Sequence, residues 1–160
     1  MKFTHNPVKH PILRTRGLAS PEGAKFGMTR NNGTRSHQGI DLALDKGFRC
    51  YAVENGRIVT TSLEWGGHGM IIMLQMNCPD KPQLHNRFAF YSHLSKINVK
   101  IGQEVKAGDV IGLSGDTGNA KGMDTVARGG HLHFEVRTER TPGLGLTGRI
   151  DPLPFISNLK

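Results

Sequence analysis

The chain has 160 residues, the size of one ordinary domain, and its 21 glycines and 6% aromatic residues predict many tight turns between short strands. No run of 18 apolar residues occurs, which excludes a membrane-spanning helix. The formal charge of +8 indicates an anionic partner or a solvated basic surface. Helix-turn-helix, zinc-finger and aromatic-studded basic patterns are all missing, so nucleic acid is not the expected partner.

The N-terminal stretch is expected to form an extended arm over residues 1–23, followed by a single domain over residues 24–160. The arm contains prolines and shows little periodicity. Its basic start lacks the continuous apolar core of a signal peptide. Three explanations stay open: export by another route, a leader that is absent from this sequence, or a cytosolic protein.

Short β segments follow the arm. FRCYAVENGRIVTTS, residues 48–62, alternates in hydrophobicity and is interrupted by the turn pair Asn55-Gly56. GHGMIIMLQM, residues 67–76, is a mostly apolar run of strand length. A glycine-rich connection joins the two runs, so we expect them to pair antiparallel.

The two cysteines have two possible states. They form no CxxC motif, which argues against a thiolate zinc site. Folding the strand pair about residues 65–66 brings Cys50 and Cys78 near each other on neighbouring strands. A Cys50–Cys78 disulfide and two buried free thiols are both compatible with this arrangement.

The second half of the chain continues the β pattern. A polar loop at 78–87 precedes the strand RFAFYSHL, and glycine-punctuated short strands occupy residues 96–118. A second loop at 118–130 precedes the last strand, HLHFEVRTE, and the tail is expected to form a turn with a short helical end. No long amphipathic helix is present, so the predicted class is all-β and mostly antiparallel.

Three histidine-bearing segments could converge in this fold. They are SHQGIDL with His37 and Asp41, FYSHL with His93, and HLH with His131 and His133. Residues i and i+2 of a strand point to the same face, so the two histidines of HLH face one spot. A catalytic zinc site takes three nitrogen or oxygen ligands and keeps one position open, which His, Asp and His satisfy. Two histidines then remain for proton transfer and charge stabilisation.

With these motifs in order, the chain resembles the LytM/lysostaphin-type zinc metalloendopeptidases. The resemblance begins at AKFGM and SHQGIDLALDKG, continues through CYAVENGRIV, GGHGMIIM and FAFYSHLSKINVKIGQEVKAGDVIGLSGDTG, and ends at GGHLHFEVR and DPLPFI. It covers about residues 24–156. It implies a barrel-sandwich hybrid fold of the duplicated hybrid-motif type with long rim loops.

The resemblance also implies roles for the five residues. His37, Asp41 and His133 would bind one zinc ion per chain, and His93 and His131 would act as catalytic histidines. The implied reaction is hydrolysis of peptide bonds in peptidoglycan stem peptides or cross-bridges by zinc-activated water. Its substrate places the activity outside the cytoplasmic membrane, in the periplasm or the cell wall.

Two insertions depart from the family pattern, at 78–87 and at 118–130, and both are expected to rim the cleft. His68 and Tyr91 are candidate substrate contacts. For His68 the alternative is a turn residue, and for Tyr91 it is a core residue.

Two other function classes are open. One is a non-catalytic module of the same fold that binds or activates other enzymes. The other is a carrier domain, because VKIGQEVKAGDVIG resembles the turns of lipoyl and biotinyl carriers and contains Lys106. For the enzyme, we expect delivery as an antibacterial secreted effector with a small immunity protein as inhibitor, or release as a phage lytic enzyme.

Overall fold

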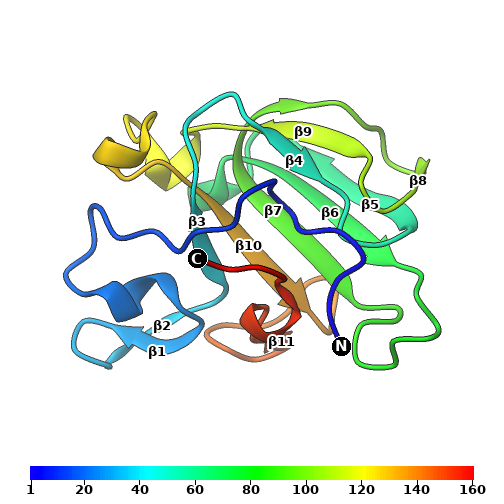
Figure 1. The fold of residues 1–160 in the computed structure, drawn as a ribbon, viewed down its shortest axis with the longest axis horizontal. Coiled ribbons are helices and arrows are strands. Elements are labelled where there is room, and N and C mark those ends of the chain that lie inside the picture. The colour runs from blue at the N-terminus through cyan, green and yellow to red at the C-terminus, as the bar shows by residue number, and fades with distance from the viewer.

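The computed structural model describes all residues, 1–160, and consists of antiparallel strands joined by loops and 3-10 turns (Figure 1). The strands are β1 (Gly27–Arg30), β2 (Arg35–His37), β3 (Ile40–Ala43), β4 (Arg49–Tyr51), β5 (Gly56–Ser62), β6 (Met70–Met76), β7 (Phe88–Ile97), β8 (Glu104–Val105), β9 (Val110–Ser114), β10 (His131–Arg137) and β11 (Arg149–Ile150). The 3-10 helices are η1 (Pro21–Ala24), η2 (Gly66–His68), η3 (Gly118–Ala120), η4 (Val126–Arg128) and η5 (Leu153–Phe155). The predicted all-β class is confirmed. No helix has the length and apolar character needed to cross a membrane.

Nine strands form one sheet, and β1 and β2 form a separate hairpin. The main path runs β11-β10-β7-β6-β5-β8, with β3 added beside β10 and the β4–β9 pair attached to β7. In Figure 1, β4 and β9 lie along the upper side of the molecule, above β7 and β10, while β1 and β2 lie at the lower left. β10 therefore has β3, β7 and β11 as neighbours, and it carries the HLH motif.

The core is built from the alternate residues of these strands that point inward. Phe134 of β10 meets Tyr91 of β7 edge to face, with ring centroids 5.1 Å apart. Ile40 and Leu42 of β3 are fully buried in the same cluster. The core thus fixes β3, β7 and β10 against one another, and these are three of the four strands that carry the histidines and Asp41.

The N-terminal arm is extended and packs on the sheet. Phe3 contacts the rings of Phe134 and Phe155, with centroids 5.8 and 5.6 Å away, and Val8 is fully buried. Leu13 forms an isolated β-bridge with Leu42. The arm is therefore integrated with the sheet, and the division of the chain at residue 23 stays a prediction.

The predicted antiparallel pairing of β5 with β6 is confirmed. The prediction that this pairing continues to Cys50 and Cys78 is wrong. Gly56 pairs with Met76 at the end of that ladder. The chain then turns through residues 52–55, and Cys50 lies on β4, opposite Gly112 of β9. Both cysteines are free and buried. The predicted disulfide is therefore wrong, and the alternative of two buried free thiols is confirmed. The reason is that the chain changes direction before Asn55-Gly56, so Cys50 lies on a different strand from Gly56.

Candidate active site

The register of β3 and β10 brings two functional side chains together. Asp41 and His133 are direct partners across the antiparallel ladder, and Asp41 Oδ1 lies 3.0 Å from His133 Nδ1. His37, at the end of β2, places its Nε2 atom 3.1 Å from the same carboxylate oxygen and 3.2 Å from His133 Nδ1. A Cβ atom at Gly39 would lie 2.2 Å from the carbonyl oxygen of Phe134, so only glycine allows this close approach between the His37 segment and β10.

These three atoms fit a tetrahedral zinc ion. With bonds of 2.0–2.1 Å, two ligands of a tetrahedral zinc ion lie about 3.3 Å apart. The three separations observed here are 3.0, 3.1 and 3.2 Å. Two imidazoles and one carboxylate are also a usual donor set for catalytic zinc, which keeps a fourth position for water or substrate.

Hydrogen bonds orient both imidazoles of this group. His37 Nδ1–H donates to the carbonyl oxygen of Lys25 at 3.0 Å, and His133 Nε2–H donates to Glu135 Oε2 at 2.9 Å. In each ring the other nitrogen is then left with its lone pair, and that lone pair faces the group of three ligand atoms. Such outer contacts fix the tautomer and the orientation of metal-binding histidines.

Two arginines hold the second oxygen of Asp41. Arg14 Nη1 lies 3.0 Å and Arg30 Nη2 lies 2.8 Å from Asp41 Oδ2. Burial alone would raise the pKa of Asp41, but the neighbouring His131 and the hydrogen bonds with His133 and His37 hold the pKa well below its ordinary value. The carboxylate therefore stays ionised and presents a single oxygen, Oδ1, to a cation.

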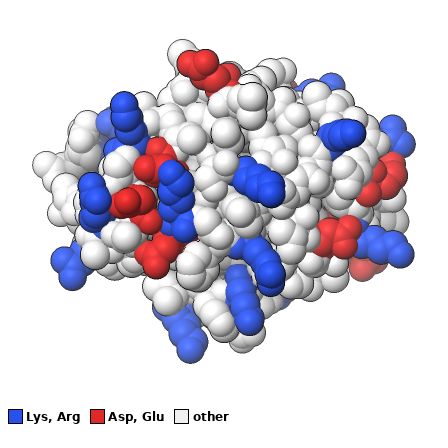
Figure 2. Space-filling model, turned by 90° about the horizontal axis from the view of Figure 1, so that it is seen from above, with Lys and Arg blue, Asp and Glu red and all other residues white.

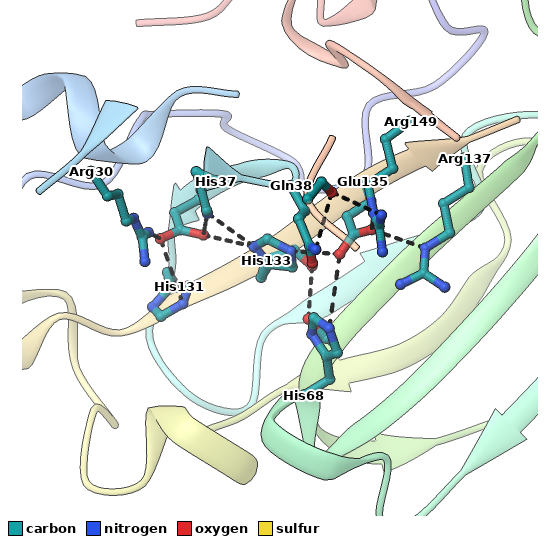
Figure 3. A network of polar contacts seen from close by, with 12 residues as sticks. Arg30, His37, Gln38, His68, His131, His133, Glu135, Arg137 and Arg149 are labelled. Atoms are coloured by element: carbon teal, nitrogen blue, oxygen red, sulfur yellow. Dashed lines mark hydrogen bonds and ion pairs between the residues drawn. The ribbon is translucent and has the colours of Figure 1, made fainter. Parts of the chain in front are cut away.

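Behind His133 lies a buried ionic network (Figure 3). Glu135 is fully buried, and its Oε1 atom accepts hydrogen bonds from Arg137 Nε and Arg149 Nε, both at 2.9 Å. Burial by itself would raise the pKa of Glu135, but the hydrogen bond from His133 and the positive charge of Arg137 lower it. His68, His133 and Glu135 form a second group with metal-ligand spacing. The two guanidinium groups on Glu135 disfavour a cation there.

His93 reaches the cleft because of a bulge in β7. Met70 pairs with Leu94 and Ile72 pairs with Tyr91, so β7 contains one extra residue at this point. His93 has a φ of +60°, which is unusual for a non-glycine residue. A bulge of this kind redirects a side chain that plain alternation would send to the other face. The outcome is that Tyr91 points into the core and His93 lines the cleft.

The rings of His93 and His131 pack edge to face beside the three ligand atoms, with their centroids 5.1 Å apart. His93 Nδ1–H donates to the Thr117 carbonyl, and His131 Nδ1–H donates to the Gly129 carbonyl, both at 2.8 Å. Burial lowers the pKa of His93 to about 3 and also lowers the pKa of His131. Both rings are therefore neutral at pH 7 and keep a basic Nε2 atom.

These residues line a cleft of about 600 Å³. His68 also borders the cleft, so the structure places it at a position from which it can touch a substrate. Tyr91 does not lie in the cleft, because it is fully buried and donates its hydroxyl hydrogen to the Tyr51 carbonyl at 2.8 Å.

The two insertions lie in different places. The insertion at 118–130 lines the cleft through Asn119, Ala120 and Met123. The insertion at 78–87 contributes no lining residue, and its Lys81 pairs instead with Glu54. The expectation that this segment rims the cleft was wrong, because the loop joins β6 to β7 at the end of those strands where Glu54 and the N-terminal arm lie.

Sequence reasoning missed three residues around the ligand group: Glu135, Arg14 and Arg30. Glu135 could have been predicted from the sequence, because it follows His131 and His133 at the same spacing of two residues and so lies on the same face of the strand. No local pattern marked the two arginines, which reach Asp41 from the arm and from β1.

The chain is similar to known peptidases. A model described as peptidase family M23 matches residues 35–143. The glycyl-glycine endopeptidase ALE-1 of Staphylococcus capitis is 34% identical over 123 residues, which cover 77% of this chain and 30% of that protein. The chain spans about a quarter to a third of the length of the curated relatives it matches.

Two solved structures share the fold. The catalytic domain of the antimicrobial peptidase lysostaphin from Staphylococcus simulans has a TM-score of 0.58 at 30% identity and covers 92% of this chain and 88% of that domain. A zinc-containing peptidase from Vibrio cholerae has a TM-score of 0.64 at 27% identity and covers 100% of this chain and 41% of that one. The predicted fold type is thereby confirmed. With the family match over most of its length and the same fold as the lysostaphin catalytic domain, this chain belongs to peptidase family M23 and is of the LytM/lysostaphin type.

Proposed function

We propose that this protein is a zinc-dependent endopeptidase that cuts peptide bonds in peptidoglycan. The proposal is carried by one observation: His37 Nε2, Asp41 Oδ1 and His133 Nδ1 lie within 3.0–3.2 Å of one another, at the wall of a cleft that two neutral histidines also line. The donor set is that of a hydrolytic zinc site with one open position.

His37, Asp41 and His133 would hold the zinc ion, which when bound polarises a carbonyl group and makes water a better nucleophile at neutral pH. His131 Nε2 accepts a proton from the attacking water, because its Nδ1–H is held by the Gly129 carbonyl and its lone pair faces the cleft. The protonated ring then stabilises the negative charge that develops on the carbonyl oxygen of the substrate. The neighbouring Asp41 Oδ2, 3.8 Å from His131 Nε2, favours that protonated form.

His93 lies next to His131 and lines the same cleft, with the two ring centroids 5.1 Å apart. Its Nε2 atom orients the attacking water or passes a proton to the leaving amine. Its Nδ1–H is fixed on the Thr117 carbonyl, so the ring approaches the substrate in one tautomer. With two neighbouring imidazoles, the site can take up a proton and return it within a single turnover.

Two findings support peptidoglycan as the substrate. The chain belongs to a peptidase family, and one relative is named glycyl-glycine endopeptidase. This substrate places the activity outside the cytoplasmic membrane. Delivery as an effector, release from a phage and an inhibitor protein stay predictions.

The test uses the zinc-loaded chain and two purified peptidoglycans, one glycine-bridged and one directly cross-linked. Mass spectrometry of the released fragments identifies new peptide termini. Termini that appear with the wild-type chain and disappear with His131→Ala, at unchanged zinc content, would support the proposal and name the bond. Bound zinc without new termini from either wall would favour the non-catalytic module of the same fold.

A further inference from the structure

The cleft carries a local excess of positive charge that the metal site does not explain. Figure 2 shows Lys and Arg spread among uncharged atoms over one face of the molecule, with acidic groups close to several of them. In the cleft the balance differs, because Arg14, Arg30 and Arg35 line it and Asp41 is its only acidic lining residue. A bound divalent cation would increase this excess further.

Two of these arginines oppose each other across the β1–β2 hairpin. Arg30 and Arg35 are direct partners in the antiparallel ladder. Directly opposite residues have Cβ atoms about 4.5–5.5 Å apart on the same face, and like charges in such a pair are destabilising. The charge of Arg35 is among the causes that lower the pKa of Arg30, after burial, and a bound anion would relieve this repulsion.

Neither guanidinium group is saturated by the protein. Arg35 is exposed and makes no side-chain hydrogen bond or ion pair. Arg30 uses Nε for the Gly23 carbonyl and Nη2 for Asp41, which leaves Nη1 without a partner. The free donors can form the forked contact that a planar carboxylate accepts.

The pair also occupies a junction. Arg30 and Arg35 line both the cleft and a neighbouring hollow of about 510 Å³ between the η1 segment and the hairpin. Glu22, the acidic residue of that second hollow, is paired with Lys25 at 3.0 Å. In Figure 3, Arg30 lies to the left of His133, on the same side as His37 and His131. A substrate that continues from the ligand atoms into the second hollow passes this arginine pair.

We propose that Arg30 and Arg35 form a subsite for a free carboxylate group of the stem peptide, next to the bond that is cut. This inference rests on the proposed function, because it assumes that the substrate is a peptidoglycan peptide. Such peptides carry C-terminal and side-chain carboxylates, whereas glycine bridges are uncharged. The subsite therefore selects stem peptides with free carboxylates over peptides in which these groups are amidated.

The experiment uses two cross-linked stem peptides that are identical except that the free carboxylates of one are primary amides in the other. Values of kcat/KM for both peptides are measured with the zinc-loaded full chain and with Arg35→Gln. We expect the wild type to prefer the acid peptide by about tenfold or more, the range of a hydrogen bond to a charged group, and Arg35→Gln to bring this ratio close to one. Arg35→Lys keeps the charge but loses the fork, so it should restore only part of the preference.

Arg49→Gln is the matched control, because Arg49 is an exposed arginine on β4 that does not line the cleft. It should keep the wild-type ratio. Equilibrium binding of both peptides to the metal-free full chain, measured by titration calorimetry, gives a second readout that does not depend on cleavage.

The outcomes separate the two proposals. Cleavage of both peptides with equal efficiency would overturn the subsite and leave the peptidase intact. A preference that Arg35→Gln does not reduce would also overturn the subsite. If zinc is bound and neither peptide is cleaved, the proposed function fails, and equal binding of the two peptides would then overturn the subsite as well.

Discussion

Asp41 and His133 are direct partners across β3 and β10, and their Oδ1 and Nδ1 atoms lie 3.0 Å apart. The two residues are separated by 92 positions in the sequence. The pairing register, held by the buried Ile40, Leu42 and Phe134, therefore positions two of the three candidate ligands without any loop. A one-residue slip would turn one of the two side chains to the other face.

Replacing His133 should abolish zinc binding. His133→Ala removes one of three ligand atoms from a site where the other two cannot complete a tetrahedron. We expect the zinc content, measured by mass spectrometry of the metal, to fall from about one ion per chain to near zero. His10→Ala is the control, since His10 is exposed on the arm and should keep full zinc content. Equal zinc content in both variants would remove His133 from the ligand set.

Replacing Glu135 should weaken zinc binding without removing a ligand. Glu135→Gln replaces the charged acceptor that orients His133 with a neutral amide. Loss of such an outer contact lowers metal affinity by about 10–100-fold. Competition with a chelating indicator measures this affinity, and Glu104→Gln, at an exposed glutamate on β8, should leave it unchanged. An affinity for Glu135→Gln within twofold of the wild type would contradict a positioning role.

Much of the site follows from sequence order, and the remainder depends on backbone irregularity and long-range contact. HLH on one strand face predicts that His131 and His133 converge, and the same alternation carried two residues further reaches Glu135. Alternation gives the wrong expectation for His93, because it puts that residue on the same face as Tyr91. The bulge in β7 turns the side chains of Tyr91 and His93 to different faces, and no local sequence motif predicts this bulge.

The cysteines and the arginines show the same limit over longer distances. Extending β5 backward through the turn at residues 52–55 placed Cys50 beside Cys78, but β4 joins β9 instead. Arg14 reaches Asp41 from an arm without regular structure, and Arg30 reaches it from a separate hairpin. Contacts of this type depend on tertiary packing, which periodicity does not encode.

Acid should destabilise the metal-free protein through His93. Burial, followed by the charges of His131 and His133, lowers the pKa of His93 to about 3. In the unfolded chain this ring titrates near pH 6.5, so between about pH 6.5 and pH 3 the unfolded state binds the extra proton. The free energy of unfolding should therefore fall as the pH is lowered through that window. Urea titrations at several pH values measure the slope.

His93→Gln is the variant that isolates this effect, because it retains a polar side chain that does not titrate. Its free energy of unfolding should fall less steeply than that of the wild type below pH 6.5. Burial also lowers the pKa of His68, to about 4. His68 therefore adds to the loss of stability at low pH, and the His93→Gln variant retains this contribution. Identical slopes for the wild type and His93→Gln would show that His93 is not held in its neutral form.

The cysteines should be unreactive in the folded protein and should react once it is unfolded. Burial raises the pKa of Cys50 to about 12 and that of Cys78 to about 11, so few thiolates exist at neutral pH. A thiol reagent should count two groups in denaturant without reductant and almost none in the native state. A count of zero in denaturant would indicate the disulfide that the structure lacks.

The arm should contribute strongly to stability through Phe3. This ring is 4% exposed and packs on Phe134, the residue that follows His133 on β10, and on Phe155 near the C-terminus. Replacing a buried phenylalanine by alanine costs about 3–5 kcal/mol, because apolar contacts are lost and a cavity remains. Phe3→Ala should therefore lower the midpoint of thermal unfolding by many degrees. Phe48→Ala is the matched control, since Phe48 is 56% exposed and its loss should change the midpoint little. If the two variants unfold at the same temperature, the arm does not support the strand that carries the HLH motif.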